Sequence, residues 1–386
     1  MPVEKVVMRT DIKSLTYDEL TAALAELSLP RYRTDQIFGW LAGGARSFDD
    51  MTNLPKALRA ELAERFAVSR PKLLRRQTSE RDGTAKYLWG FEDGGAAESV
   101  VMSYRHGRAV CVSSQVGCRM GCAFCATAAR GLSRNLTAAE MLDQVILSGA
   151  DCGARASNIV LMGMGEPLDN FDNVLRFLRI VGDGRGVNVG ARHISLSTCG
   201  LTEKVDKLGE LNLQLTLSVS LHAPDDETRS RLMPVNRGMG VDKLFDSTRR
   251  YFERTGRRVS YEYTLIDGVN DSLRHARLLA GRLAKSGGHL NLIPLNRVPG
   301  REFRPSARER VRAFEGALRE RGVNYTFRRR LGGDIDAACG QLRGSADTDR
   351  AVQINTEKVS GCNGDMGQYG CRRRETPESG RVRDDA

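Results

Sequence analysis

Three cysteines within eight residues, Cys118, Cys122 and Cys125, form the densest group of reactive side chains in the sequence. Their Cys-x3-Cys-x2-Cys spacing places three soft sulfur ligands on one loop, which is typical of a metal or cluster site. A [4Fe–4S] cluster normally takes four thiolates, so a loop with three leaves one iron open to a substrate. The alternative is a structural zinc ion with Cys111 as the fourth ligand. Zinc thiolates usually come in closely spaced pairs, whereas Cys111 lies within an expected strand, so the spacing favours the cluster.

A second reactive thiol, Cys339, stands alone in the segment 336–341, which reads Asp-Ala-Ala-Cys-Gly-Gln. Such a cysteine is either a small buried apolar side chain or a nucleophile on a mobile loop, and the glycines at 332, 333 and 340 favour the loop. The sequence holds nine cysteines, and those outside the motifs are expected to be structural or exposed: Cys152, Cys199, Cys362 and Cys371. This usage indicates cluster ligation and thiol chemistry in a reducing cytoplasm rather than a disulfide framework.

Strands and helices alternate from residue 108 onward, which predicts a mainly parallel sheet in an α/β barrel, full or partial. The expected strands are 109–114, 158–162, 193–197, 215–220, 259–266, 290–295 and 324–328. The expected helices are 137–148, 173–181, 241–254, 273–285 and 306–321. Functional residues of such folds gather where the strands end, and the cysteine loop follows the first strand.

Glycine and polar residues follow several of the other expected strands. The segment 163–167 (Gly-Met-Gly-Glu-Pro) follows the second strand, 198–200 the third, 221–224 the fourth, and Asn296 the sixth. Because glycine lets a ligand approach the backbone closely, the 163–167 segment is either a plain turn or a ligand-binding loop.

The chain outside this region has a different organisation. Residues 1–70 are expected to form a helical module, because 14–20 has the cap residue and acids of a helix start and apolar residues recur at helical steps in 31–41 and 54–66. Residues 71–107 are expected to form a β-hairpin linker, and 346–386 a disordered tail. The basic residues of the helical module either touch nucleic acid or belong to a solvated face.

Composition limits the class of protein. The 386 residues carry a formal charge of +11, which favours a polyanionic partner over a generally basic background. No apolar run reaches the ~18 residues that a membrane span needs, and the first residues show no signal-peptide pattern. We therefore expect a cytoplasmic protein that contacts no membrane.

Taken together, the motifs resemble one family of radical S-adenosylmethionine (SAM) enzymes, the adenine-C2 RNA methyltransferases of bacteria. They are the segments 111–118, 118–125, 162–168 (Met-Gly-Met-Gly-Glu-Pro-Leu), 220–224 (Ser-Leu-His-Ala-Pro) and 336–341. The resemblance covers roughly residues 10 to 345. It implies an α/β fold, a partial (β/α)6 radical SAM barrel at 108–345, with the N-terminal helical module as an accessory domain that assists RNA binding.

The resemblance also implies the cofactors and their residues. Cys118, Cys122 and Cys125 would ligate one [4Fe–4S] cluster per chain, and the open iron would take SAM. The residues that match the family's SAM-binding positions are Gly165, Glu166, Ser197, Ser220, Leu221, His222 and Asn296.

A two-step mechanism follows from the same resemblance. Adenine C2 has no acidic proton and little nucleophilicity, so ordinary methyl transfer to it fails. Cys339 would take a methyl group from one SAM as a sulfur nucleophile, and a radical made from a second SAM would activate that methyl group for addition to C2. Cys111 would release the product by forming a transient disulfide with Cys339. Glu98 would accept the C2 proton, although a carboxylate on a hairpin strand more often faces solvent.

The implied partners are an adenosine in the peptidyl-transferase centre of 23S rRNA and the adenosine just 3′ of certain tRNA anticodons. A monomer is expected, served by a flavodoxin-like electron donor and by a thiol reductant. Arginine-rich stretches at 301–312 and 328–330 are expected to grip phosphates. Two alternatives stay open: an adenine-C8 methyltransferase that confers antibiotic resistance, and a non-catalytic iron–sulfur or zinc protein that binds RNA.

Overall fold

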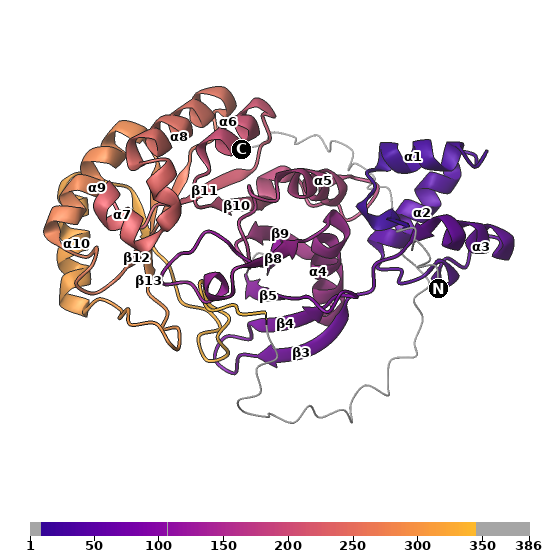
Figure 1. Cartoon of the computed structure of the whole chain (residues 1–386), viewed down its shortest axis with the longest axis horizontal. Coiled ribbons are helices and arrows are strands. Elements are labelled where there is room, and N and C mark those ends of the chain that lie inside the picture. The colour runs from indigo at the N-terminus through magenta and orange to yellow at the C-terminus, as the bar shows by residue number, and fades with distance from the viewer. Residues whose placement is uncertain (1–8, 106, 345–386) are drawn as a thin grey trace, which may run out of the picture. The chain divides into compact units, whose positions relative to one another are not determined.

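The computed structural model describes residues 9–105 and 107–344 of the protein (Figure 1). The tail expected at 346–386, with Cys362 and Cys371, lies outside the described residues. Within the described part of the chain, no helix combines the length and the apolar character that crossing a membrane requires.

A ten-stranded sheet organises the described residues, in the order β14-β13-β12-β11-β10-β9-β6-β5-β4-β3. Its strands are β3 (Lys72–Thr78), β4 (Ala85–Gly90), β5 (Ala96–Tyr104), β6 (Gly107–Cys111), β9 (Ala156–Leu161), β10 (Ile194–Thr198), β11 (Thr216–Ser220), β12 (Ser260–Leu265), β13 (His289–Pro294) and β14 (Tyr325–Phe327). Neighbouring strands from β6 through β14 pair in parallel. This parallel sheet, with helices between its strands, confirms the expected α/β class.

The hairpin predicted within 71–107 forms β4 and β5, and β5 pairs antiparallel with β6, so the hairpin extends the same sheet. The sequence pattern missed β3. Leu73 and Leu74 are adjacent, and the register shifts between Leu73 and Arg75, so the alternation that marks a strand is interrupted. Two short pairings lie outside this sheet, β1 (Thr10–Asp11) with β2 (Phe66–Ala67) and β7 (Gln115–Gly117) with β8 (Leu132–Asn135).

Helices connect the parallel strands. These helices are α4 (Ala138–Asp151), α5 (Phe171–Gly182), α6 (Thr202–Glu210), α7 (Asp226–Leu232), α8 (Val241–Thr255), α9 (Leu273–Ser286) and α10 (Arg308–Glu320). The last three lie along the outer side of the sheet (Figure 1). Gly256 and Gly287 end α8 and α9 in the left-handed conformation that glycine favours. The helices α6 and α7 were not predicted from the sequence, because both are short and few of their side chains are buried.

The described N-terminal residues form the helices α1 (Tyr17–Ala25), α2 (Tyr32–Ala42) and α3 (Lys56–Arg65). Thr16 caps α1 in a capping box with Glu19, which confirms the helix start expected in 14–20. The buried Lys13 donates through Nζ to Asp143 Oδ1 of α4 at 2.7 Å. This buried pair fixes the helical module to the helix that follows the first parallel strand.

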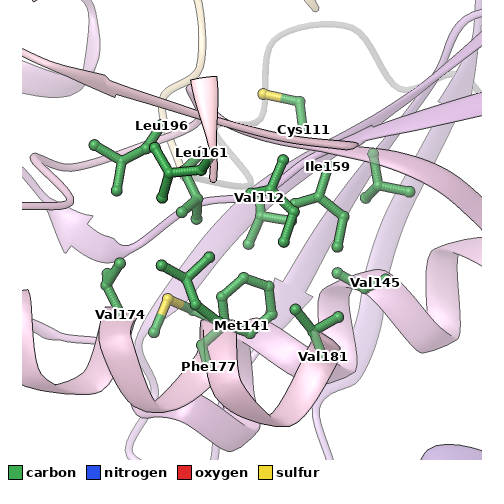
Figure 2. Close-up of a cluster of buried hydrophobic side chains, with 14 of the residues drawn as sticks. Cys111, Val112, Met141, Val145, Ile159, Leu161, Val174, Phe177, Val181 and Leu196 are labelled. Atoms are coloured by element: carbon green, nitrogen blue, oxygen red, sulfur yellow. The ribbon is translucent and has the colours of Figure 1, made fainter. Parts of the chain in front are cut away.

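A hydrophobic core fills the space between the sheet and the helices α4 and α5 (Figure 2). The labelled core side chains are Val112, Met141, Val145, Ile159, Leu161, Val174, Phe177, Val181 and Leu196. Cys111 lies next to Val112 but directs its thiol away from this core (Figure 2). Because successive side chains of a strand point to opposite faces, Cys111 belongs to the inner face of the curved sheet.

Candidate active site

A cavity of about 170 Å3 lies at the carboxyl ends of the parallel strands. The predicted residues that line it are Cys118, Cys122, Cys125, Gly165, Glu166, Ser197, Ser220, His222, Asn296 and Cys339. They come from the ends of β10 and β11, from the loops that follow β7, β9, β11 and β13, and from the segment after β14, so only the folded chain brings them together. Leu221 is fully buried beside the cavity, and Cys111 and Glu98 lie outside its wall.

The cysteine loop follows β7 and packs against the segment that carries Cys339. The backbone N–H of Cys118 donates to Gly131 O at 2.8 Å, and that of Ala126 donates to Gly340 O at 2.8 Å. Gly117 has φ 82°, and a Cβ at that position would lie 2.0 Å from Gly131 O, so the turn into the loop requires glycine.

The three cysteines line one cavity, and burial and the charge of Cys125 raise the pKa of both Cys118 and Cys122. Burial, and then the charges of Glu166 and Cys125, raise the pKa of Cys118 to about 12. Burial, Cys125 and Cys118 likewise raise the pKa of Cys122. Among residues 9–105 and 107–344, no group of three or more His, Cys, Asp or Glu side chains could hold a metal ion. In an iron–sulfur cluster each thiolate binds a different iron atom, so the three sulfur atoms need not surround a single point. The three cysteines therefore fit a cluster.

Glu166 is buried and held by backbone donors at the cavity wall. Its Oε1 accepts from the N–H of Leu168 at 3.0 Å, and its Oε2 accepts from the N–H of Cys199 at 2.7 Å. Burial raises its pKa, while hydrogen bonds from Thr198 and Cys199 oppose that rise. The preceding Gly165 has φ 99°, and a Cβ there would lie 2.6 Å from the Gln115 side chain. The turn therefore aims a fixed carboxylate at the cavity.

His222 presents a neutral imidazole to the cavity. Its Nδ1 accepts a hydrogen bond from the N–H of Thr264 at 3.0 Å, so the ring hydrogen is carried by Nε2. Burial, and then the charge of Arg229, lower its pKa to about 3. Its ring meets that of Phe124, from the cysteine loop, edge to face at 4.9 Å between centroids. The aromatic residue of the loop and the histidine therefore form one wall.

The side-chain amide of Asn296 makes a hydrogen bond through its nitrogen but not through its oxygen. Its Nδ2 donates to Cys339 O at 3.1 Å. Its Oδ1 is buried without a hydrogen-bond partner among the described residues. A buried acceptor of this kind is costly unless a ligand completes it, and the amino acid and ribose parts of SAM carry N–H and O–H donors. The open oxygen of Asn296 therefore fits such a ligand.

The segment that carries Cys339 is held by hydrogen bonds on the carboxyl-terminal side of the thiol. Thr127 Oγ1 donates to Leu342 O at 2.7 Å, and Gln341 Nε2 donates to Arg297 O at 3.0 Å. Burial raises the pKa of Cys339, and the charge of Arg328 opposes that rise. The exposed surface of Cys339 faces the cavity that it lines.

Cys111 lies at the end of β6, opposite Val160 of β9 in the sheet. Burial raises its pKa to about 12, and the charge of Cys339 adds to the rise. Cys111 and Cys339 are both free thiols in the structure.

Glu98 is buried, unlike most carboxylates on hairpin strands. The reason is that β5 lies inside the ten-stranded sheet rather than at its edge. Glu98 Oε1 pairs with Lys86 Nζ at 3.1 Å. Its Oε2 accepts from the backbone N–H groups of Arg343 at 2.6 Å and Gly344 at 3.2 Å. Glu98 therefore holds the chain directly after Cys339.

Two buried charged residues of this region carry no sequence signal. Arg229 on α7 is fully buried and donates to Cys199 O at 2.6 Å and Ser220 O at 3.0 Å. It thereby fixes the carbonyl ends of two neighbouring strands. Glu262 on β12 lines the cavity beside Arg328. An isolated Arg or Glu in a sequence looks like a surface residue, so only the folded chain reveals either one.

Comparisons with known proteins agree with this geometry. Residues 112–279 match the Radical SAM superfamily, and residues 10–68 match the ribosomal RNA large subunit methyltransferase N-terminal domain. A probable dual-specificity RNA methyltransferase RlmN from Lachnospira eligens is 46% identical over 335 residues, covering 86% of this chain and 96% of that protein. The corresponding protein of Desulforamulus reducens is 48% identical over 336 residues, covering 87% of this chain and 96% of that protein.

A solved structure is similar over the same region. The crystal structure of a radical SAM methyltransferase from Sphaerobacter thermophilus superimposes with a TM-score of 0.83 at 46% sequence identity, covering 87% of this chain and all (100%) of that one. The expected radical SAM barrel is therefore confirmed.

Proposed function

This chain belongs to the RlmN family of radical SAM RNA methyltransferases, and from this membership and the cavity we propose that it methylates carbon C2 of adenosine in 23S rRNA and tRNA. The observation that carries the proposal is the meeting of the three-cysteine loop, the SAM-type positions and Cys339 in one cavity. A cluster site alone would not need a separate thiol at its wall.

Cys339 is proposed to accept the first methyl group. A thiolate is the nucleophile that attacks the SAM methyl carbon, giving S-methylcysteine and S-adenosylhomocysteine. Arg328 favours the thiolate, because its charge opposes the rise that burial causes in the pKa of Cys339. Asn296 holds the Cys339 carbonyl and so orients the thiol.

Cys118, Cys122 and Cys125 are proposed to hold a [4Fe–4S] cluster, which when bound supplies the electron that cleaves a second SAM to methionine and a 5′-deoxyadenosyl radical. Gly165 and Glu166 would receive the amino group of SAM. The remaining SAM positions, Ser197, Ser220, Leu221, His222 and Asn296, would seat the rest of the molecule.

Product release is assigned in this proposal to Cys111 and Glu98. The methylene group of Cys339, once bonded to C2, gives an adduct that must lose one electron, for which the oxidised cluster would be the acceptor, and the C2 proton. The Cys111 thiolate would then attack the sulfur of Cys339, so that an S–S bond forms and the S–C bond breaks. The carbon leaves with the bonding pair and takes a proton to become the methyl group, which frees the RNA. Glu98 would accept the C2 proton, as a carboxylate on the strand next to that of Cys111. A cellular thiol reductant then restores both cysteines.

The helical module of α1 to α3 is proposed to assist RNA binding. A monomeric enzyme of the cytoplasm, served by a flavodoxin-like electron donor, would complete the system. Net charge of +11 supports an RNA partner through attraction to phosphates.

Mass spectrometry of nucleosides tests the proposal directly. The anaerobically reconstituted enzyme, with SAM and a reductant, is incubated with unmodified 23S rRNA and tRNA, and the products are digested. We expect 2-methyladenosine in both RNAs. The appearance of 8-methyladenosine without 2-methyladenosine would identify the C8 alternative instead. Failure to form 5′-deoxyadenosine at all would point to a non-catalytic RNA-binding protein.

A further inference from the structure

Glu262 is a buried carboxylate in the cavity wall that the proposed mechanism does not use. Only 4% of the residue is exposed. Its Oε1 accepts from Asn291 Nδ2 at 3.1 Å and from Arg328 Nη2 at 3.2 Å. Its Oε2 is buried and has no hydrogen-bond partner among the described residues. One half of the carboxylate is therefore fixed by the protein, and the other half is free to accept.

An unpaired carboxylate oxygen in a cavity wall indicates a ligand with an N–H or O–H donor. Buried polar groups are almost always hydrogen-bonded, and leaving a charged acceptor unpaired is costly. The residues beside Glu262 in the neighbouring strands are Ser220 and Asn291. Asn291 donates to the other oxygen, and neither residue makes a hydrogen bond to Oε2. The open oxygen therefore marks a polar contact made by a bound molecule.

Arg328 supplies the complementary donors. Its side chain is 37% exposed and lines the same cavity as Cys339. A guanidinium has five N–H donors, and the contact with Glu262 uses one nitrogen. The influence of its charge on the pKa of Cys339 agrees with a guanidinium that faces the thiol. The cavity wall beside Cys339 therefore presents the unpaired oxygen of Glu262 as a hydrogen-bond acceptor, next to the several N–H donors of Arg328.

We propose that Glu262 and Arg328 hold the target adenine by its N1–N6 edge, an inference that rests on the proposed function. This edge carries an amino donor at N6 and an acceptor at N1, which match the open oxygen of Glu262 and the guanidinium of Arg328. The base must leave its stack to enter such a cavity, and flipped bases are recognised on this edge.

The same contact decides which carbon is methylated. C2 is bonded to N1, so a base held at N1 and N6 presents C2 beside the guanidinium of Arg328, on the side of Cys339. A base held at N7 and N6 would present C8 instead. Glu262 and Arg328 therefore act as specificity-determining residues for C2.

A cycle that changes both the protein and the base tests the inference. Wild type and Glu262→Ala are compared on an anticodon stem-loop RNA whose target is either adenosine or purine riboside, which lacks the N6 amino group. We expect Glu262→Ala to lower kcat/KM on adenosine roughly 10- to 100-fold, as expected for one specific base contact. On purine riboside the same substitution should have little further effect. Glu253→Ala, which removes an exposed carboxylate on α8, serves as the control.

Methylation of Cys339 by SAM without RNA separates this role from others. In Glu262→Ala it should not fall below the wild-type rate, because burial and the charge of Glu262 raise the pKa of Cys339, and removing that charge favours the thiolate. SAM binding should be unchanged. If the rate of Cys339 methylation and the affinity for SAM both fall together with RNA methylation, Glu262 binds the ribose hydroxyls of SAM or stabilises the fold. The inference would then be wrong. Equal losses on adenosine and purine riboside would also overturn it. Glu262→Gln keeps the shape of the side chain, but its one oxygen serves Asn291 and Arg328 and its NH2 group would face the N6 amino donor. It should therefore lose about as much activity on adenosine as Glu262→Ala. A wild-type enzyme that makes no 2-methyladenosine would instead overturn the proposed function itself.

Discussion

Breaking the buried ion pair between Lys86 and Glu98 should loosen the segment that carries Cys339. Lys86 Nζ lies 3.1 Å from Glu98 Oε1, with 9% and 7% of the two side chains exposed. Lys86 also donates to Asp336 O at 3.2 Å, before the thiol, while Glu98 holds the backbone after it. The pair therefore fastens the segment 336–344 at both ends.

The expected size follows from the burial of the pair. Removing one partner of a buried pair costs about 3–5 kcal/mol, because the remaining charge stays buried without its counter-charge. Lys86→Met and Glu98→Gln preserve side-chain size, so about 3 kcal/mol is expected for each. Because each 1.36 kcal/mol is roughly a factor of ten, the equilibrium for opening this segment should rise about 150-fold. The double variant should cost much less than the sum, since it leaves no unpaired charge.

Hydrogen–deuterium exchange at the backbone amides of Arg343 and Gly344 measures this opening, because their N–H groups donate to Glu98. Glu92→Gln, which alters an exposed carboxylate in the turn before β5, is the matched control. Unchanged exchange in Lys86→Met, or additive losses in the double variant, would refute the reasoning.

The same variants separate the two roles of Glu98. Lys86→Met keeps the carboxylate, so it should slow methylation of Cys339 by SAM without stalling later steps. Glu98→Gln should slow methylation of Cys339 and also stall the later steps. A covalent protein–RNA adduct should then accumulate, which denaturing gels would detect. Wild-type turnover by Glu98→Gln would exclude Glu98 as the proton acceptor.

The remaining predictions concern three other residues. Cys339→Ala should abolish RNA methylation, measured by nucleoside mass spectrometry, while SAM binding stays intact; full activity would contradict the role of this thiol. Because the pKa of Cys111 is raised to about 12, its thiolate fraction rises about tenfold per pH unit between roughly pH 7 and 9. The rate at which the protein–RNA adduct is released should rise with pH in the same proportion. A release rate that does not change with pH would argue against Cys111 as the attacking group. Burial raises the pKa of Asp11 from 3.8 to about 6, so the folded protein holds a proton that the unfolded chain releases, and stability falls as pH rises through this window. Asp11→Asn should therefore raise the melting temperature at pH 7.5 but not near pH 4; an equal shift at both would contradict this explanation.

The sequence was most informative where chemistry is local. The spacing of Cys118, Cys122 and Cys125 indicates a cluster because ligands on one short loop must lie together. Alternation of strands and helices predicted the parallel sheet, since hydrophobic periodicity depends on near neighbours in the chain. The start of α1 was predictable because Thr16 and Glu19 cap it within four residues.

The tertiary structure decided what depends on residues far apart in the chain. Lys86 and Glu98 meet the segment after β14 only because β4 and β5 join the sheet, and Glu98 is buried for the same reason. Glu262 meets Arg328 because parallel strands align their ends across a wide gap in sequence. The sequence by itself determined which atoms take part in the proposed reaction. Which charges are buried, paired or left open beside Cys339 was decided by folding, because burial and pairing are properties of the surroundings and not of a residue type.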